Sequence, residues 1–207
     1  MALLERFQRG KLKMARIEAF SDGVFAVVVT LLVLELRVPG LTDPRSAAEL
    51  GHKLVELAPK LVSWLASFII VAKFWLNHHH LMDLPRRATY GTAWLNSLFL
   101  MVMSMTPFPT ALIGEYPWNP LGLTVFGCVM ALGTLAFLAL QAYIARHAQL
   151  HDAVGRKPPP ITAKSWLAVG SYLLGAALGW VYAPLAFVMF FLTPLFFITP
   201  PGREAPA

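Results

Sequence analysis

Residues 16–36 read RIEAFSDGVFAVVVTLLVLEL, and this stretch decides the fold class. Positions 24–34 are apolar except for Thr30. Such a run is typical of a membrane-crossing helix, because about 20 apolar residues span about 30 Å of hydrocarbon. Arg16 and Asp22 lie at the N-terminal end of the run, where a charged side chain is costly within a membrane unless it is paired.

The composition of the whole chain indicates a membrane protein. Of its 207 residues, 57% are hydrophobic and 14% are charged, whereas soluble domains carry about 25% charged residues. The net charge of +6 is explained by lysines and arginines held on the cytoplasmic side, so no nucleic-acid partner is expected. A single cysteine excludes an intramolecular disulfide and a thiolate metal cluster.

Six apolar segments are long enough to cross a membrane. They cover residues 17–37, 55–77, 88–112, 120–145, 163–182 and 184–199. The sequence therefore predicts an all-α, polytopic membrane protein with six transmembrane helices per subunit, in one domain over residues 1–207. The first segment contains an acidic residue, lacks a convincing cleavage site and precedes further spans, so we expect it to be retained rather than removed as a signal peptide.

The distribution of cations predicts the orientation. With the N-terminus inside, all but four of the 17 lysines and arginines fall on the inner side. The four on the opposite side are Arg37, Arg45, Lys53 and Lys60. This bias predicts a multi-pass protein of the cell membrane with both termini in the cytoplasm. Late in the third segment, Pro107 and Pro109 each remove a backbone donor, so that helix should kink or end there.

The first helix has two different faces. With about 100° of rotation per residue, one stripe contains Gly23, Val27, Thr30, Leu31 and Leu34. The stripe is either an ordinary packing or lipid-facing surface, or the wall of a pore. In a pore the large apolar side chains would form a constriction that can gate by dewetting, and the threonine would offer a passing ion its one hydroxyl.

Asp22 points about 140° away from that stripe. Together with Arg16 and Ser21 it is either an interfacial cap that favours the helix dipole or part of a buried network that ties the first helix to its neighbours. In both cases we expect Asp22 to hold the helix in place while the other face performs the function.

Three adjacent histidines at positions 78–80 suggest a metal site. Neighbouring helical side chains diverge by about 100°, so the three cannot converge on one ion, and one of them can reach inward while the others meet water. The sequence has no nucleophile elbow, P-loop or dinucleotide-binding turn, so no enzymatic activity is expected, and it has no T-V-G-Y-G filter.

The stretch RIEAFSDGVFAVVVTLLVLEL resembles the first helix of the transmembrane protein 175 family, the potassium channels of lysosomes and bacteria with an R-x-x-x-F-S-D signature. FWLNHHHLM (74–82), WLNSLFLMVMSMTPFPTALIGEY (94–116) and the basic linker GRKPPPITAK (155–164) also look like bacterial members. The resemblance covers essentially the whole chain.

This resemblance implies a six-helix subunit, a homotetramer and a central pore lined by the first helix of each subunit. It also implies potassium-selective conduction without a carbonyl filter, and no cofactor or metal beyond permeant potassium. The family's apolar constriction falls on Val27, Leu31 and Leu34, and its pore threonine on Thr30.

The R-x-x-x-F-S-D network implied by the family matches Arg16, Phe20, Ser21 and Asp22, and its histidine partner best matches His78. A proton-coupled secondary transporter is the alternative, since such proteins bind through intramembrane acids and use broken helices near the midplane. Here Asp22 would be the acid, and the two prolines of the third segment would mark the break.

Overall fold

The computed structural model describes residues 13–85, 87–147, 160–161 and 163–197. The regular elements of these residues are all α-helices, which confirms the all-α prediction. Their bounds are α2 (Met14–Val33), α3 (Ala47–Glu56), α4 (Ala58–Met82), α5 (Tyr90–Ser104), α6 (Pro107–Glu115), α7 (Pro120–Arg146), α8 (Ala163–Leu178) and α9 (Ala183–Phe197).

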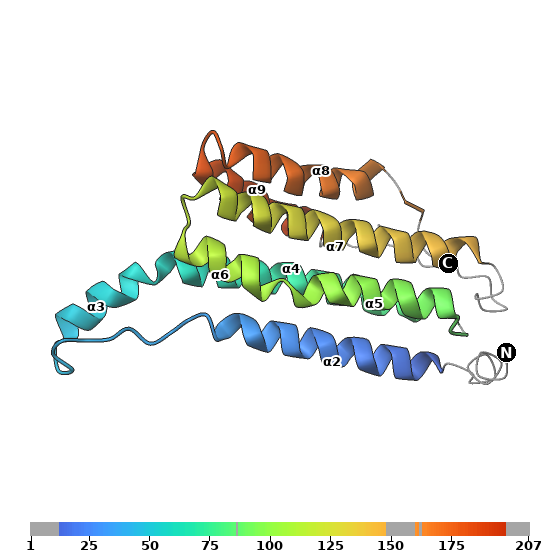
Figure 1. The fold of residues 1–207 in the computed structure, drawn as a ribbon, viewed down its shortest axis with the longest axis horizontal. Coiled ribbons are helices and arrows are strands. Elements are labelled where there is room, and N and C mark those ends of the chain that lie inside the picture. Colours follow the sequence, from blue (N-terminus) through green and yellow to red (C-terminus); the bar gives the residue numbers. More distant parts are fainter. Residues whose placement is uncertain (1–12, 86, 148–159, 162, 198–207) are drawn as a thin grey trace, which may run out of the picture.

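Most helices lie roughly side by side in one elongated bundle (Figure 1). α7 is central, because it packs against α5, α6 and α8, while α9 packs against α8. α2 lies at one edge, on α4 and α5. One side of α2 therefore faces the bundle, and none of the described helices covers its other side.

The core is formed by large apolar side chains of several helices. Phe25 and Leu32 of α2, Phe74 of α4 and Phe99 of α5 are all almost fully buried in one cluster. At the other side of the bundle, a Cβ added to Gly127 of α7 would come within 2.6 Å of the Tyr172 carbonyl oxygen. A glycine there lets the backbones of α7 and α8 approach closely.

Within the part of the chain that the structure describes, three helices are long and apolar enough to cross a membrane: Ala58–Met82, Tyr90–Glu115 (α5 with α6) and Pro120–Arg146. Ser165–Leu178 and Ala183–Pro194 are shorter apolar helices. α2 has 20 residues but carries Arg16, Glu18 and Asp22 in its N-terminal half.

Helix boundaries differ from the sequence-based segments in two places. The segment predicted over 55–77 is the end of α3, a separate helix, followed by α4, which continues to Met82. Pro59 favours a new start there, because proline fits the first turn of a helix. The segment predicted over 88–112 is divided into α5 and α6 just before Pro107, as the prolines indicated.

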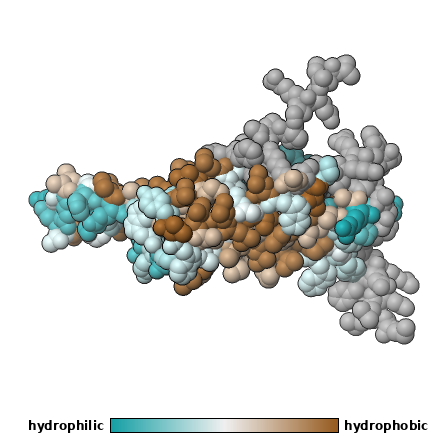
Figure 2. Space-filling view, turned by 90° about the horizontal axis from the view of Figure 1, so that it is seen from above, coloured by the Kyte–Doolittle hydropathy of each residue, from teal (hydrophilic) through white to brown (hydrophobic). Residues whose placement is uncertain are grey.

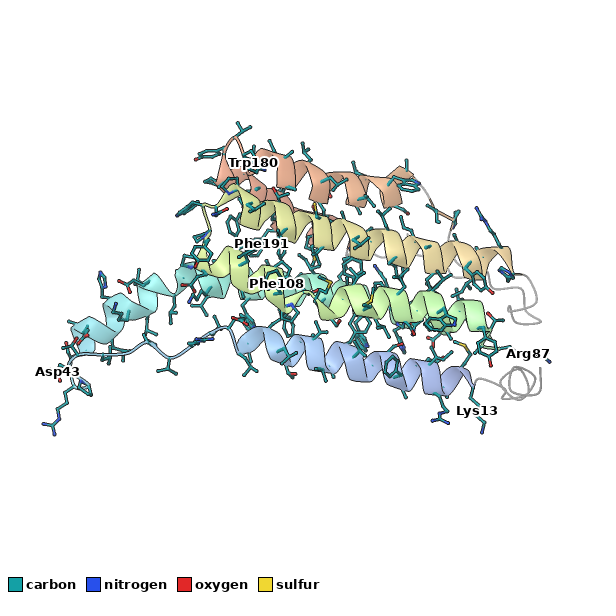
Figure 3. All side chains as sticks on the ribbon, viewed as in Figure 1. Lys13, Asp43, Arg87, Phe108, Trp180 and Phe191 are labelled. Carbon is teal, nitrogen blue, oxygen red and sulfur yellow. The ribbon has the colours of Figure 1, made fainter. Side chains whose placement is uncertain are left out.

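Exposed aromatic side chains mark both ends of the bundle. Figure 3 shows Lys13 and Arg87 at one end, here called the Arg87 end, and Trp180 at the other, here called the α3 end. The exposed Tyr116, Trp118, Trp180 and Tyr182 belong to the turns at the α3 end, and the exposed Tyr90, Trp94 and Trp166 to helix starts at the Arg87 end. An apolar band lies between the two ends (Figure 2). Tryptophan and tyrosine gather in this way at membrane interfaces.

Candidate functional site: the uncovered face of α2 and its anchors

The inner side of α2 fixes how this helix is rotated. Its buried residues are Ile17, Ser21, Phe25, Val28 and Leu32. They recur every three or four positions, which places them on one side of a helix. Because this side packs against α4 and α5, the opposite side of α2 must point away from the subunit.

The opposite side is apolar and exposed, and we call it the uncovered face of α2. It consists of Phe20, Gly23, Val27, Thr30, Leu31 and Leu34, all exposed. Val27 is 55% exposed, Leu31 41% and Leu34 67%. All the residues predicted for the constriction therefore lie on one surface, which the other described residues of the chain do not cover.

Thr30 is the only side chain of this face with a hydroxyl group. Its Oγ1 lies 3.0 Å from the Ala26 carbonyl oxygen and 2.9 Å from the Val27 carbonyl oxygen, and it donates back into the helix. A hydroxyl that donates in this way keeps its lone pairs for another partner. Thr30 can therefore present an acceptor oxygen to a cation on the uncovered face.

The family resemblance assigned Arg16 and Phe20 to the same network as Ser21, but in the single chain both lie outside it. Phe20 is 59% exposed and Arg16 is also exposed. The cause is their position: Arg16, Phe20 and Val27 lie within about 40° of one another around the helix, on the side opposite Ser21. In the single chain, within the described ranges, no side-chain hydrogen bond or ion pair joins Arg16 to a partner.

Ser21 and His78 do belong to one buried network, and Asn96 connects them. The Asn96 amide donates to Ser21 Oγ at 3.0 Å, and Ser21 Oγ donates to the Ile17 carbonyl oxygen at 2.8 Å. Asn96 Oδ1 lies 2.6 Å from His78 Nε2. Since an amide oxygen only accepts, the His78 Nε2–H is the donor. These three hydrogen bonds link α2, α4 and α5.

Aromatic rings surround the histidine of this network. The His78 ring stacks on Phe99 with centroids 5.5 Å apart, and the Phe25 ring lies 5.6 Å away. His79 and His80 are exposed, as expected for adjacent positions on a helix. The structure therefore identifies which of the three histidines faces the bundle.

Asp22 is anchored separately, at the surface of the bundle. Trp75 of α4 donates its indole N–H to Asp22 Oδ1 at 2.9 Å. The Trp75 ring stacks on His79 at 5.8 Å, and His79 Nε2 lies 3.6 Å from Asp83 Oδ2. Asp22 thus links α2 to α4 through this hydrogen bond.

Asn96 and Trp75 are two hydrogen-bond partners of α2 that sequence reasoning did not identify. Both lie within the stretches that carried the family resemblance, and an asparagine inside an apolar run is itself a signal. Their partners are 75 and 53 residues away in the chain. Helical spacing reveals only neighbours three or four positions apart, so these pairings required the fold.

The break between α5 and α6 lies next to α4, and α6 contacts both α4 and α2. Thr110 of α6 donates to Ser67 Oγ of α4 at 2.7 Å and to the Thr106 carbonyl oxygen at 2.8 Å. All three residues are buried. The Thr110 hydroxyl thus links α6 to α4 next to the break, while the buried Thr106 Oγ1 has no hydrogen-bond partner among the described residues.

Comparison with known proteins places the chain in a family. Residues 16–107 match the family described as endosomal/lysosomal potassium channel TMEM175. A potassium channel from Streptomyces collinus is 34% identical over 202 residues, covering 93% of this chain and 97% of that protein. A potassium channel from Chamaesiphon minutus is 33% identical over 187 residues, covering 88% of this chain and 92% of that protein.

The fold agrees with a solved structure. The crystal structure of a lysosomal potassium-selective channel TMEM175 homolog from Chamaesiphon minutus superposes with a TM-score of 0.75 at 32% identity, covering 89% of this chain and 95% of that one. The chain thus shares its helical bundle with a class of membrane channels. The chain is a member of the TMEM175 family.

Proposed function

We propose that this chain forms a potassium-selective channel for passive conduction and has no enzymatic activity. The observation that carries the proposal is the uncovered face of α2, which combines large apolar side chains with one hydroxyl. The proteins similar to it over nearly their whole length are potassium channels. Potassium is the permeant ion, and no other cofactor is required.

The pore requires several copies of the chain, because one α2 cannot enclose a channel. We propose a homotetramer with fourfold symmetry, in which each subunit contributes the same face. Six elements would cross the membrane in each subunit: α2, α4, α5 with α6, α7, α8 and α9. The bilayer would cover the outer band, and the aromatic residues at both ends would lie at its interfaces.

The constriction would be formed by four copies of Val27, Leu31 and Leu34. Rings of apolar side chains exclude water when the pore is narrow, so they close it to ions without a moving plug. Between these rings the Thr30 hydroxyl oxygens would replace part of the water around a potassium ion. Selectivity would then arise from side-chain oxygens and not from backbone carbonyls.

The two anchors of α2 would set the width of this pore. The Ser21–Asn96–His78 network and the Asp22–Trp75 hydrogen bond hold one side of the helix against α4 and α5. Any rotation of α2 would break these bonds and turn the apolar side chains away from the axis. Ser21, Asp22 and His78 therefore position the pore without touching the ion.

We also propose that the Arg87 end faces the cytoplasm of the cell, with both termini on that side. Lysines and arginines concentrate near this end in the sequence, as expected for cytoplasmic loops. The arrangement favours a channel over a proton-coupled secondary transporter. Asp22 accepts a hydrogen bond from Trp75 at the bundle surface, and the Thr110 hydroxyl beside the helix break bonds to Ser67 of the same subunit.

The decisive experiment is a reversal-potential measurement on the purified protein in a planar bilayer, with potassium on one side and sodium on the other. A passive current that reverses near the potassium equilibrium potential is expected. A current that reverses at zero would overturn selectivity. Absence of current, together with potassium uptake driven by an imposed proton gradient in liposomes, would establish the transporter instead.

A further inference from the structure

α3 is an element that neither the pore nor the bundle explains. None of its ten residues is buried, and Figure 1 shows it projecting past the ends of α6 and α7. Its leucines nevertheless lie on one side, which excludes the exposed Val55. Leu50 and Leu54 are one turn apart and Leu57 follows at the junction with α4. Leu54 is 51% exposed.

This helix is well formed rather than a loosely coiled connection. The Ser46 hydroxyl caps its N-terminus by accepting from the Glu49 N–H at 3.2 Å. The Glu49 carboxylate in turn accepts from the backbone N–H groups of Thr42 at 2.7 Å and Asp43 at 3.0 Å. These hydrogen bonds hold the pKa of the Glu49 carboxyl below its ordinary value, and the bond from Thr42 has the largest effect. The fold therefore fixes the direction in which α3 projects.

The polar side of α3 already has its partners within the helix. Glu56 pairs with Lys53 at 2.9 Å and with His52 at 3.2 Å. Charged groups that pair along one helix face are typical of a surface that stays in water. The opposite, leucine-bearing side has no polar pairing of this kind, and its exposed leucines Leu50 and Leu54 are available for contact with another surface.

Hydrocarbon cannot cover this leucine side. Lys60, in the first turn of α4, forms an ion pair with Glu115 at the end of α6, next to the exposed Tyr116. Lys60 is therefore level with the aromatic residues of the α3 end, where a membrane interface is expected. All of α3 comes before Lys60 in the chain, and its ten residues are about 15 Å long. The helix projects away from the bundle, past the level of Lys60 (Figure 1). Its leucines therefore lie beyond the hydrocarbon, where lipid tails do not cover them.

We infer that the leucine side of α3 docks on a second copy of this chain, outside the membrane. α3 leans toward the side of the bundle that carries α2 (Figure 1), and that side must face the other subunits if α2 lines a shared pore. In a symmetric assembly every α3 then meets its neighbour in the same way. This inference rests on the proposed tetramer and adds to it a second contact, above the pore.

Single-cysteine cross-linking tests the contact. In a Cys128→Ser background, Leu54→Cys places a thiol on the leucine side and Ala48→Cys places one on the opposite side. The proteins are reconstituted in liposomes and treated with a short bifunctional maleimide. We expect Leu54→Cys to give at least about tenfold more cross-linked subunits than Ala48→Cys, because docked neighbours have a high effective concentration. Equal yields would overturn the inference.

A charge substitution provides the second readout. Leu54→Glu should reduce the tetramer fraction severalfold in native mass spectrometry, whereas Ala48→Glu, which adds the same charge to the opposite side, should leave it unchanged. Helix content by circular dichroism controls for misfolding. A conducting tetramer without α3 cross-links overturns this inference alone. A wild-type protein that is monomeric and carries no current overturns the proposed function as well.

Discussion

Thr30 offers the sharpest residue-level test of selectivity, because it is the only hydroxyl on the uncovered face of α2. Thr30→Ala removes the acceptor oxygen and keeps the helix, so the preference for potassium over sodium should fall. The reversal potential under opposed potassium and sodium gradients should move toward zero. Thr30→Ser retains the oxygen and is the matched control, expected to stay close to wild type. An unshifted reversal potential in Thr30→Ala would remove Thr30 from the ion path.

The apolar side chains beside Thr30 should set the conductance. Val27→Asn or Leu31→Asn places an amide in the constriction, which stabilises water there and lowers the barrier to ions. We expect a larger single-channel conductance in both variants. Leu132→Asn introduces the same group at an exposed apolar position of α7 and should leave the conductance unchanged. Equal behaviour of all three variants would exclude α2 as the pore lining.

Asn96 should matter for stability more than for selectivity. Asn96→Ala leaves His78 and Ser21 buried without their shared partner, and an unsatisfied buried polar group costs about 1–3 kcal/mol. A lower midpoint of thermal unfolding in detergent is therefore expected. Ser97→Ala, at the neighbouring exposed position, should shift the midpoint little. If Asn96→Ala melts like the wild type, the network does not anchor α2.

At the level of helices, alanine substitutions at two helical glycines, Gly127 and Gly170, should change the thermal stability in opposite directions. Gly127→Ala brings a methyl group against the Tyr172 carbonyl oxygen of α8, so α7 and α8 must separate and thermal stability should fall. A Cβ at Gly170 meets nothing within 4 Å. Gly170→Ala should raise the unfolding free energy by up to about 1 kcal/mol, since alanine is the better helix former. The two melting midpoints, measured in one detergent, test the packing of α7 on α8.

The helices differ in how far the sequence predicts them. Long apolar runs predict α4, α5 with α6, and α7 well, because the membrane imposes both length and composition. The prolines at positions 107 and 109 also indicate where the third segment breaks. α3 escapes notice because its ten residues alternate charges with leucines and run directly into the apolar start of α4. Composition alone merges the two helices.

The sequence also predicts only part of the candidate site. The stripe of α2 follows from helical geometry, and its residues are exposed as a pore wall requires. Arg16 and Phe20 lie on that same side, so the signature motif is divided between two faces of one helix. The anchors Asn96 and Trp75 depend on how α4 and α5 pack against α2. Packing between distant segments is set by tertiary structure and leaves no periodic trace in one sequence.

At the scale of the whole molecule, the bundle has a covered side and an open side. α8 and α9 pack on α7, away from α2, while α2 lies at the opposite edge with its apolar face exposed. In the proposed tetramer the pore forms only between copies, so a single subunit would be incomplete. Function would then depend on every copy in the ring being intact.

This dependence has a genetic consequence. If intact and pore-blocking subunits are produced in equal amounts and mix at random in a fourfold ring, only about one ring in sixteen contains four intact copies. A blocking substitution on the edge helix would therefore suppress most of the current from a normal gene beside it. A substitution that prevents assembly would spare the normal copies and halve the current instead.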